Sequence, residues 1–227
     1  MIAILSPFPS QLLRKKLFSS EVEKRRRRIE PQEFEVIFDP RLLRKETCLL
    51  YEINWGGRNR VWRHTSQNTD KHVEINFIEK FTSERYFCPS TRCSIVWFMS
   101  WSPCGECSKA IAEFLSRFPN VTLHIYVARL YYHADQWNRQ GLRDLISRGV
   151  TIQIMTEREC CYCWRNFVNY PPSNEDHWPR YPHPWVRLYA LELHCIALVS
   201  DFGFLIFDPI VIPEIGSCKN SSFVWCA

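Results

Sequence analysis

The sequence predicts one α/β domain of three layers, in which a five-stranded mixed sheet carries helices on both faces. Two observations lead to this fold class. From residue 93 onward, short apolar runs of strand length alternate with stretches of helical periodicity, an order that favours parallel strands joined by crossover helices. Before them, two strand-like segments flank Gly56-Gly57, which is typical of an antiparallel hairpin.

The first part of the chain is expected to contribute a short helix, the hairpin and a second helix. Glu30–Asp39 is typical of a short helix that stops before a proline. Thr47–Asn54 and Asn59–Arg63 supply the hairpin strands, and a polar loop follows them. From His72 onward, apolar residues at helical spacing predict the second helix: Val73, Phe77, Ile78 and Phe81.

The second part of the chain is expected to alternate strands and helices. The apolar run Cys93–Met99 predicts a buried strand, and Ser102-Pro103 predicts the start of a helix with Ser102 as its N-cap. The remaining elements are expected in the order strand, helix, strand, helix, helix, over Val121–Ala128, Asp135–Arg148, Val150–Met155, Glu157–Tyr170 and Trp185–Val199.

Composition excludes several classes of protein. Hydrophobic residues make up 46% of the 227 residues and aromatic residues 15%, enough to bury a core, so a wholly disordered chain is excluded. No run of 18 apolar residues occurs, so no membrane span is expected. Met1–Pro9 has no basic n-region and makes a poor signal peptide. The poor signal peptide and the odd total of 11 cysteines favour a reducing intracellular compartment, where clustered cysteines more often bind metal or act in catalysis.

Positive charge is concentrated near the N-terminus. The formal net charge is +5, and Arg14–Arg28 alone holds eight basic residues against two acidic ones, so the rest of the chain is close to neutral. Residues 1–25 are expected to form a flexible basic arm. The run at its end is typical of a nuclear-localisation signal or an RNA-phosphate contact, with a solvated tail as the alternative: Lys24, Arg25, Arg26, Arg27 and Arg28.

One motif carries the chemistry. His72-Val73-Glu74 is followed after 28 residues by Pro103–Cys107, the H-x-E…P-C-x-x-C signature of zinc-dependent nucleobase deaminases. Cys104 and Cys107 lie three residues apart at the start of the predicted helix, so both sulfurs face the same way where the helix dipole favours thiolates. With His72 they supply three ligands for one Zn²⁺ and leave the fourth position for water, as in catalytic sites.

Glu74 is expected to move protons rather than to bind the metal. Zinc lowers the pKa of a bound water, and Glu74 is placed to pass the water's protons to N3 of cytosine and to the leaving ammonia. The alternative is a closed structural zinc site with a fourth ligand from elsewhere in the chain. The candidates for that ligand include Cys88, Cys93, Cys160, Cys161 and Cys163, of which the last three are otherwise expected to be core or surface thiols.

Four segments resemble the AID/APOBEC polynucleotide cytidine deaminases: His72–Phe77, Ser100–Cys107, Ala128–Tyr131 and Arg165–Pro172. Three further segments are similar to the members that edit apolipoprotein B mRNA: Arg26–Glu30, Asn138–Asp144 and Tyr189–Cys195. The resemblance runs from Arg26 to Leu198. It implies the family's zinc-dependent cytidine deaminase fold over residues 26–198. It also implies hydrolytic C-to-U editing of single-stranded RNA, an mRNA in particular, with single-stranded DNA as a second substrate.

The resemblance further implies partners and a location. An RNA-binding complementation factor, a homodimer, and a presence in both cytoplasm and nucleus are expected, with one Zn²⁺ per chain and no membrane. The ends of the chain depart from the family pattern. Residues 199–227 stand where the family has a Leu- and Pro-rich module used for self-association and partner binding. Weakened dimerisation and weakened site-specific editing are therefore expected.

Within the family, four positions around the zinc motif bind the target nucleotide. Asn68 matches the Asn that contacts that nucleotide, and Thr47 lies where members hydrogen-bond the flipped base. Trp101 and Ser102 match residues that line the pocket, with Trp101 beside the base. From the residues alone, Asn68 fits a turn, Thr47 a strand and Trp101 ordinary packing.

The resemblance also implies contacts farther from the target base. Tyr131, Tyr132 and His133 match the loop that reads flanking bases, and aromatic residues at a strand end suit base stacking. Phe77 and Phe98 match positions linked to RNA binding, although their places on an apolar helix face and in a buried strand favour core packing.

Two other functions would use the same features. A free-nucleoside deaminase would share the metal motif, but a closed nucleoside pocket needs neither the aromatic pair Tyr131-Tyr132 nor a basic arm. A non-catalytic RNA-binding subunit would keep the fold without the chemistry. Comparing the turnover of free cytidine with that of a single-stranded oligonucleotide distinguishes a polynucleotide deaminase from a free-nucleoside deaminase. Comparing wild type with Glu74→Gln distinguishes an enzyme from a non-catalytic RNA-binding subunit.

Overall fold

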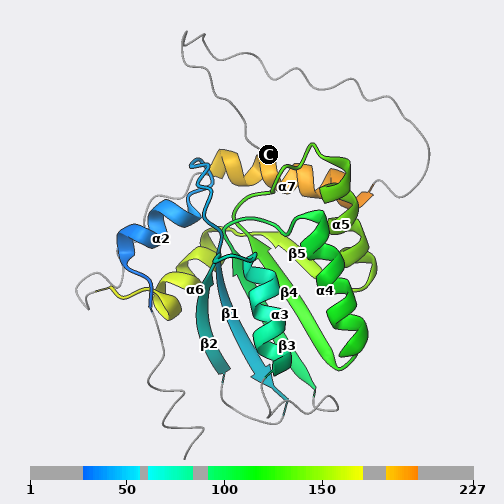
Figure 1. Ribbon diagram of the computed structural model, residues 1–227. Coiled ribbons are helices and arrows are strands. Elements are labelled where there is room, and N and C mark those ends of the chain that lie inside the picture. Colours follow the sequence, from blue (N-terminus) through cyan, green and yellow to red (C-terminus); the bar gives the residue numbers. More distant parts are fainter. Residues whose placement is uncertain (1–27, 57–60, 84–91, 171–182, 199–227) are drawn as a thin grey trace, which may run out of the picture.

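The computed structural model describes residues 28–56, 61–83, 92–170 and 183–198. They build one sheet with the strand order β2-β1-β3-β4-β5 (Figure 1). The strands are β1 (Cys48–Trp55), β2 (Val61–Gln67), β3 (Cys93–Met99), β4 (Val121–Val127) and β5 (Thr151–Ile154). The helices are α2 (Pro31–Phe38), α3 (Val73–Ser83), α4 (Gly105–Arg117), α5 (Gln136–Ser147), α6 (Glu157–Phe167) and α7 (His183–Leu198).

β3 lies where the antiparallel and parallel parts of the sheet meet. β1 pairs antiparallel with β2 and with β3, whereas β3, β4 and β5 run parallel. Met99 at the end of β3 pairs with both Leu49 and Val127. The carboxyl ends of β3 and β4 therefore lie side by side, and the segments after them leave the sheet at one edge. The mixed five-stranded sheet predicted from the sequence is confirmed.

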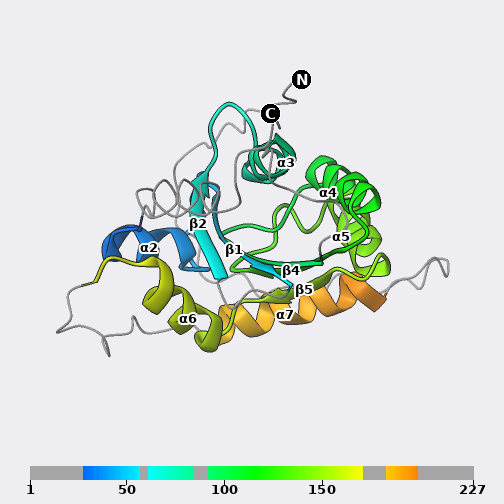
Figure 2. The ribbon, with the colours of Figure 1, turned by 90° about the horizontal axis from the view of Figure 1, so that it is seen from below.

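Helices cover both faces of this sheet (Figure 2). α3, α4 and α5 lie on one face and α2 and α6 on the other, while α7 contacts β5 and α5. The side chains of β1 contribute to the cores on both faces, because successive side chains of a strand point to opposite faces. Leu49, Tyr51 and Ile53 enter the core shared with α3, α4 and α5, and Cys48 and Leu50 enter the core shared with α2 and α6.

Two glycines let α4 and α5 approach closely. A Cβ at Gly105 would lie 2.2 Å from the Trp137 ring, and a Cβ at Gly141 would lie 2.8 Å from Cβ of Ser108. A larger residue at either position would push the helices apart. The close approach allows the Asn138 side chain of α5 to reach the first residue of α4, where its oxygen accepts the Gly105 N–H at 2.8 Å.

Several predicted boundaries are wrong, two of them by three or more residues. α6 ends at Phe167 rather than Tyr170, because Val168 turns to extended backbone and forms an isolated bridge with Ile29. β2 continues through Gln67 into the stretch expected to be a polar loop, since its ladder with β1 extends that far. The turn of the hairpin itself lies outside the described residues.

The predicted arm (residues 1–25) and tail (199–227) also lie outside the described residues. Within the part of the chain that the structure describes, no helix is long and apolar enough to cross a bilayer. The cysteines of these same segments are all free thiols. The domain limits given by the sequence stay predictions.

Candidate active site

Three metal-ligating side chains meet where α3 and α4 begin. His72 directly precedes α3, Cys104 is the N-cap of α4, and Cys107 lies in the first turn of α4. Nδ1 of His72 lies 3.2 Å from Sγ of Cys107 and 3.7 Å from Sγ of Cys104. All three ligand atoms lie within 4.8 Å of one another. The fold therefore brings together the three residues that the sequence predicts as ligands.

The spacing of these atoms fits a tetrahedral zinc ion. Zn–N and Zn–S bonds of about 2.0 and 2.3 Å place nitrogen and sulfur about 3.5 Å apart across a tetrahedral angle. That value lies between the two observed N···S distances. One imidazole and two thiols also form a donor set that zinc prefers. The residues present therefore fit the metal.

The cluster contains no fourth His, Cys, Asp or Glu from the described residues. Cys160 and Cys163 are buried in the core of α2 and α6, on the far side of the sheet, and Cys161 is half-buried on the same helix. Cys93 is buried at the start of β3, and Cys88 lies outside the described residues. Three protein ligands leave room for a water, which suits catalysis better than a closed structural site.

The N-terminus of α4 prepares its two thiols for metal binding. The Cys107 N–H donates to Sγ of Cys104 at 3.4 Å, at a helix end that favours negative charge. The hydrogen bond between the two side chains lowers the pKa of Cys104 to about 5, and the same bond, together with burial, raises the pKa of Cys107. The pair thus loses one proton readily, and a bound cation would favour loss of the second.

Ser102 does not cap α4, contrary to the prediction. Its hydroxyl accepts the Tyr131 N–H at 2.9 Å, and its own N–H donates to the Arg129 carbonyl at 2.9 Å. Cys104 takes the capping position instead, so α4 begins at Gly105. Because of these bonds, buried Ser102 ties the segment that carries the thiols to the segment that follows β4.

Glu74 is buried beside the ligands. It lies in the first turn of α3, two residues after His72, and is 3% exposed. Burial raises the pKa of Glu74 to about 7, against opposing contributions from its backbone N–H and from His72 and Cys107. A carboxyl group with a pKa near neutrality both accepts and donates protons at physiological pH. Glu74 therefore has the property that the predicted proton transfer requires.

Thr47 and Asn68 lie together at the entrance to α3. The Asn68 N–H donates to the Thr47 carbonyl at 3.1 Å, and the Asn68 side-chain oxygen accepts the Val73 N–H at 3.0 Å. Asn68 thus satisfies a free donor at the start of α3, in the manner of a cap. Asn68 is thus held beside the residue that follows His72, and Thr47 is bonded to Asn68. The contact of both residues with a nucleotide stays a prediction.

Aromatic residues gather on the two segments that follow β3 and β4. The rings of Trp101 and Tyr131 meet edge to face at 6.1 Å, and those of Tyr131 and Tyr132 at 4.7 Å. Tyr132 is 54% exposed, and its φ of 36° lies in the left-handed region. His133 is exposed, with Nδ1 3.5 Å from the Glu192 carboxylate of α7. Trp101, Tyr131 and Tyr132 therefore form one connected aromatic surface, and His133 follows it along the chain.

Phe77 and Phe98 lie in the two cores. They are 3% and 4% exposed. Phe77 packs edge to face against Tyr51 and Trp97, and Phe98 stacks on Tyr126. As placed here, neither ring offers a surface to RNA, and core packing describes both.

Of the predicted basic patch, the structure describes only Arg28. Its side chain is exposed, and Nη1 donates to the Val168 carbonyl at 3.3 Å. Arg25, Arg26 and Arg27 lie outside the described residues.

Sequence reasoning missed two buried polar residues near the ligands. Asn138 is 7% exposed and holds Gly105, the neighbour of a ligand, whereas Arg129 is fully buried after β4. Asn138 shares the buried face of α5 with Leu142 and Leu145. A polar residue at helical spacing from these leucines could have indicated in the sequence that its side chain is buried and hydrogen-bonded. A charged residue within the apolar stretch that ends β4 is the corresponding signal for Arg129.

Residues 37–170, more than half of the chain, match the family model described as APOBEC4-like AID/APOBEC deaminase. The chain belongs to the AID/APOBEC deaminase family. The matched region includes all three proposed zinc ligands and Glu74, and the resemblance seen in the sequence is confirmed.

Named relatives extend the match beyond that region. Over 173 residues, this AID/APOBEC deaminase is 82% identical to the C->U-editing enzyme APOBEC-1 of Rattus norvegicus, with 76% of each chain covered. It is 69% identical to the enzyme of that name from Homo sapiens and 64% identical to that from Monodelphis domestica. These two alignments cover 76% of this chain and 73% of the relative.

Proposed function

We propose that this AID/APOBEC deaminase is a zinc-dependent enzyme that hydrolyses cytosine to uracil in single-stranded RNA, with single-stranded DNA as a second substrate. One observation carries the proposal: a His, Cys, Cys cluster of zinc geometry with the buried carboxyl of Glu74 beside it. The relatives from rat and human, whose names are those of C->U-editing enzymes, support the reaction.

The side chains of the site divide the chemistry among them. His72, Cys104 and Cys107 would hold zinc, which supplies Lewis-acid activation of water at neutral pH. Glu74 accepts a proton from the attacking water and passes it to N3 as the water oxygen bonds to C4 of cytosine. The second water proton goes by the same carboxyl group to the amino nitrogen, the C4–N4 bond breaks, and ammonia leaves. Cytosine and water thus become uracil and ammonia.

The surroundings of the cluster favour a polynucleotide over a free nucleoside. Trp101, Tyr131 and Tyr132 form a connected aromatic surface that opens to solvent at Tyr132. Base stacking on such residues contributes about 1–3 kcal/mol per base. The target cytosine must be unpaired, because a base inside a duplex is out of reach. Asn68 and Thr47, at the entrance to α3, are the residues proposed to contact the target nucleotide.

Partners and location follow from the resemblance. An mRNA such as that of apolipoprotein B is the proposed target, and an RNA-binding complementation factor is the proposed partner. The basic run Lys24–Arg28 supports passage between cytoplasm and nucleus. A homodimer weaker than those of the family is proposed, because residues 199–227 depart from the family's association module.

The proposal is tested by exposing RNA and single-stranded DNA to the purified zinc-loaded protein and sequencing the products deeply. Glu74→Gln is the test variant, and Glu79→Gln is its control, since Glu79 is on the same helix but exposed and paired with Lys71. C-to-U changes from wild type and from the control, and none from Glu74→Gln at equal zinc content, are expected.

Other outcomes point to the rival functions. Wild-type protein that binds RNA as Glu74→Gln does, with neither converting cytosine, would contradict the enzyme and support a binding subunit. Turnover of free cytidine as fast as that of an oligonucleotide would contradict a polynucleotide substrate.

A further inference from the structure

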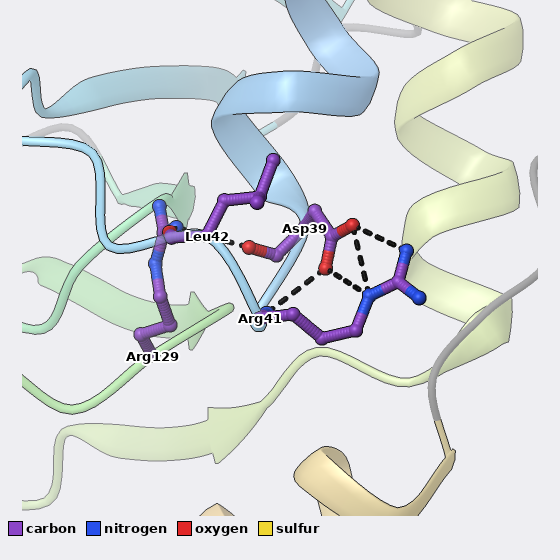
Figure 3. A network of polar contacts seen from close by, with 4 residues as sticks. All are labelled: Asp39, Arg41, Leu42 and Arg129. Atoms are coloured by element: carbon purple, nitrogen blue, oxygen red, sulfur yellow. Dashed lines mark hydrogen bonds and ion pairs between the residues drawn. The ribbon is translucent and has the colours of Figure 1, made fainter. Parts of the chain in front are cut away.

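Arg129 is a buried cation that the proposed chemistry does not use. It follows β4 directly and is fully buried. Burial lowers the pKa of Arg129 to about 10, so the guanidinium remains protonated at neutral pH. The nearby Asp39 carboxylate is occupied by Arg41, whose Nη2 lies 2.7 Å away (Figure 3). A buried charge of this kind needs other acceptors.

Those acceptors are backbone carbonyls from two distant segments. Nε donates to Ser100 O at 3.0 Å, at the end of β3. Nη1 donates to Asp39 O at 3.0 Å and to Leu42 O, and Nη2 donates to Ile37 O at 2.5 Å. Figure 3 shows the guanidinium meeting the chain as it leaves α2. Carbonyls at a helix C-terminus lack helical partners and favour a cation, so the guanidinium closes this end of α2.

The same guanidinium supports a residue of the site. Its Cζ lies 4.4 Å from the centroid of the Trp101 ring, a cation–π contact. The Trp101 indole N–H in turn donates to Arg44 O at 2.8 Å, farther along the segment that Arg129 holds. Arg129 and Trp101 therefore bind successive parts of segment 37–44 and contact each other. The Arg129 carbonyl also accepts the Ser102 N–H, which fixes its backbone beside the thiol-bearing segment.

We propose that Arg129 is a positioning residue for polynucleotide deamination, which fixes segment 37–44 and the Trp101 ring as a preformed wall of the site. This inference rests on the proposed function. Ile37 and Phe38 at the start of the segment are buried, but the four side chains from Arg41 to Arg44 are exposed, so residues 41–44 have little apolar burial to hold them in place. The bonds from Arg129 and Trp101 supply that order before nucleic acid binds, and preorganisation of this kind favours correct placement of the reacting base.

The test variant is Arg129→Lys, assayed with zinc loaded on a single-stranded RNA oligonucleotide. Lysine keeps a positive charge, but its ammonium has three donors on one atom and no planar face to stack on the indole. Zinc content is expected to stay unchanged while kcat falls about 10²-fold through misplacement of the base. Trypsin is expected to cleave after Arg41 and Arg44 at least about 10-fold faster than in wild type, because the segment opens locally.

Arg63→Lys is the matched control. Arg63 is a partly buried guanidinium on β2, bound to Glu52 of β1 and to the Tyr162 hydroxyl of α6. Arg63→Lys is expected to lower the melting temperature without changing kcat by more than about twofold, since these partners are not among the groups that Arg129 binds. This separates a positioning role from a loss of stability.

Each outcome bears on the inference. A folded Arg129→Lys protein with wild-type kcat, or with unchanged protection from trypsin, overturns it. If the variant does not fold, trypsin digestion of the native wild-type protein tests the inference. Cleavage after Arg41 or Arg44 as fast as in the unfolded chain overturns the inference, and protection of these two sites supports it. A wild-type protein inactive on both RNA and DNA overturns the proposed function instead, whereas an active wild type with an equally active Arg129→Lys overturns only the role of Arg129.

Discussion

Among the residues that the structure describes, two glutamates are buried, on opposite sides of the sheet, and their surroundings differ. Glu52 of β1 is 8% exposed and lies between a cation and a hydroxyl: Arg63 Nε donates to it at 2.5 Å and the Tyr162 hydroxyl at 2.7 Å. Glu74 of α3 is 3% exposed, and burial raises its pKa to about 7. The first carboxylate has its charge neutralised, whereas the second is kept close to its protonation midpoint.

The comparison teaches that, between two carboxyl groups that are both buried, the presence of a bonded cation separates two roles. A carboxylate with a bonded guanidinium has a partner for its charge and acts in the structure of the fold. A carboxyl group that is desolvated without such a cation costs stability but exchanges protons near neutral pH. We therefore expect substitutions of Glu52 to act on folding and substitutions of Glu74 to act on chemistry.

The largest expected difference is in activity. Glu74→Gln removes the group that moves protons and is expected to lower the deamination rate by about 10³-fold, within the range for general acid–base groups. Glu52→Gln is expected to change the rate by less than about threefold, because no atom of it reaches the cluster. Single-turnover assays of both variants at equal zinc content check this. A large loss for Glu52→Gln would erase the distinction between the two residues.

The second expected difference between the two glutamates is in how the free energy of unfolding depends on pH. In zinc-free protein, the pKa of Glu74 rises from 4.5 in the unfolded chain to about 7 in the folded one, so the folded state binds more protons between these values. Stability from this group is fully present below pH 4.5 and is lost as pH rises through 7. Glu74→Gln should therefore be more stable than wild type by about 3 kcal/mol at pH 8, and similar to it at pH 4.5. Urea titrations at both pH values measure the difference, and equal stabilities at pH 8 would contradict the cause given for the raised pKa.

Glu52→Gln should show the opposite sign. It leaves the partly buried guanidinium of Arg63 without its counter-charge and is expected to cost about 2 kcal/mol of unfolding free energy at pH 7. Chemical denaturation measures the unfolding free energy of this variant and of Glu79→Gln, the control, which removes the exposed ion pair of Glu79 with Lys71. A cost no larger than that of the control would show that the Glu52 pair contributes nothing to stability.

A smaller effect is expected where α5 supports the metal ligands. Gly141→Ala places a Cβ 2.8 Å from Ser108, so α5 must shift from α4 at a cost of about 1–2 kcal/mol, with weaker zinc binding because Asn138 moves with it. Gly149→Ala is the control, since its Cβ meets nothing within 4 Å and its φ of 86° adds only backbone strain. Zinc titrations of both proteins measure the effect. Equal zinc affinities would show that α5 does not support the ligands.

The zinc ligands were readable from the sequence because they lie in two short segments and helical spacing fixes how the two thiols face. The roles of Arg129 and Glu52 were not readable, because their partners come from far along the chain: Arg129 binds a carbonyl 90 residues away and Glu52 binds a hydroxyl 110 residues away. Only the folded sheet brings such groups together. Local reasoning predicted strands and helices well for the same reason, since periodicity is a local property.

The misplaced N-cap shows how a distant partner overrides a local rule. Ser102 before a proline is a good capping candidate, yet its hydroxyl is taken by Tyr131 from the next strand end. A thiol then caps α4. The local preference of Ser102 is outweighed by a bond that holds two strand-end segments together, which is where sequence rules are expected to fail in enzymes.

The backbone of Tyr132 has an evolutionary consequence. A left-handed conformation costs a tyrosine about 1–2 kcal/mol, and a residue that stays more than half exposed recovers little of that by burial. Selection for stability alone would therefore replace it by glycine or asparagine. A lineage that keeps a large aromatic residue at this position under that pressure retains a surface for bases, and a drift to glycine beside an intact zinc cluster would mark a deaminase that has changed its substrate.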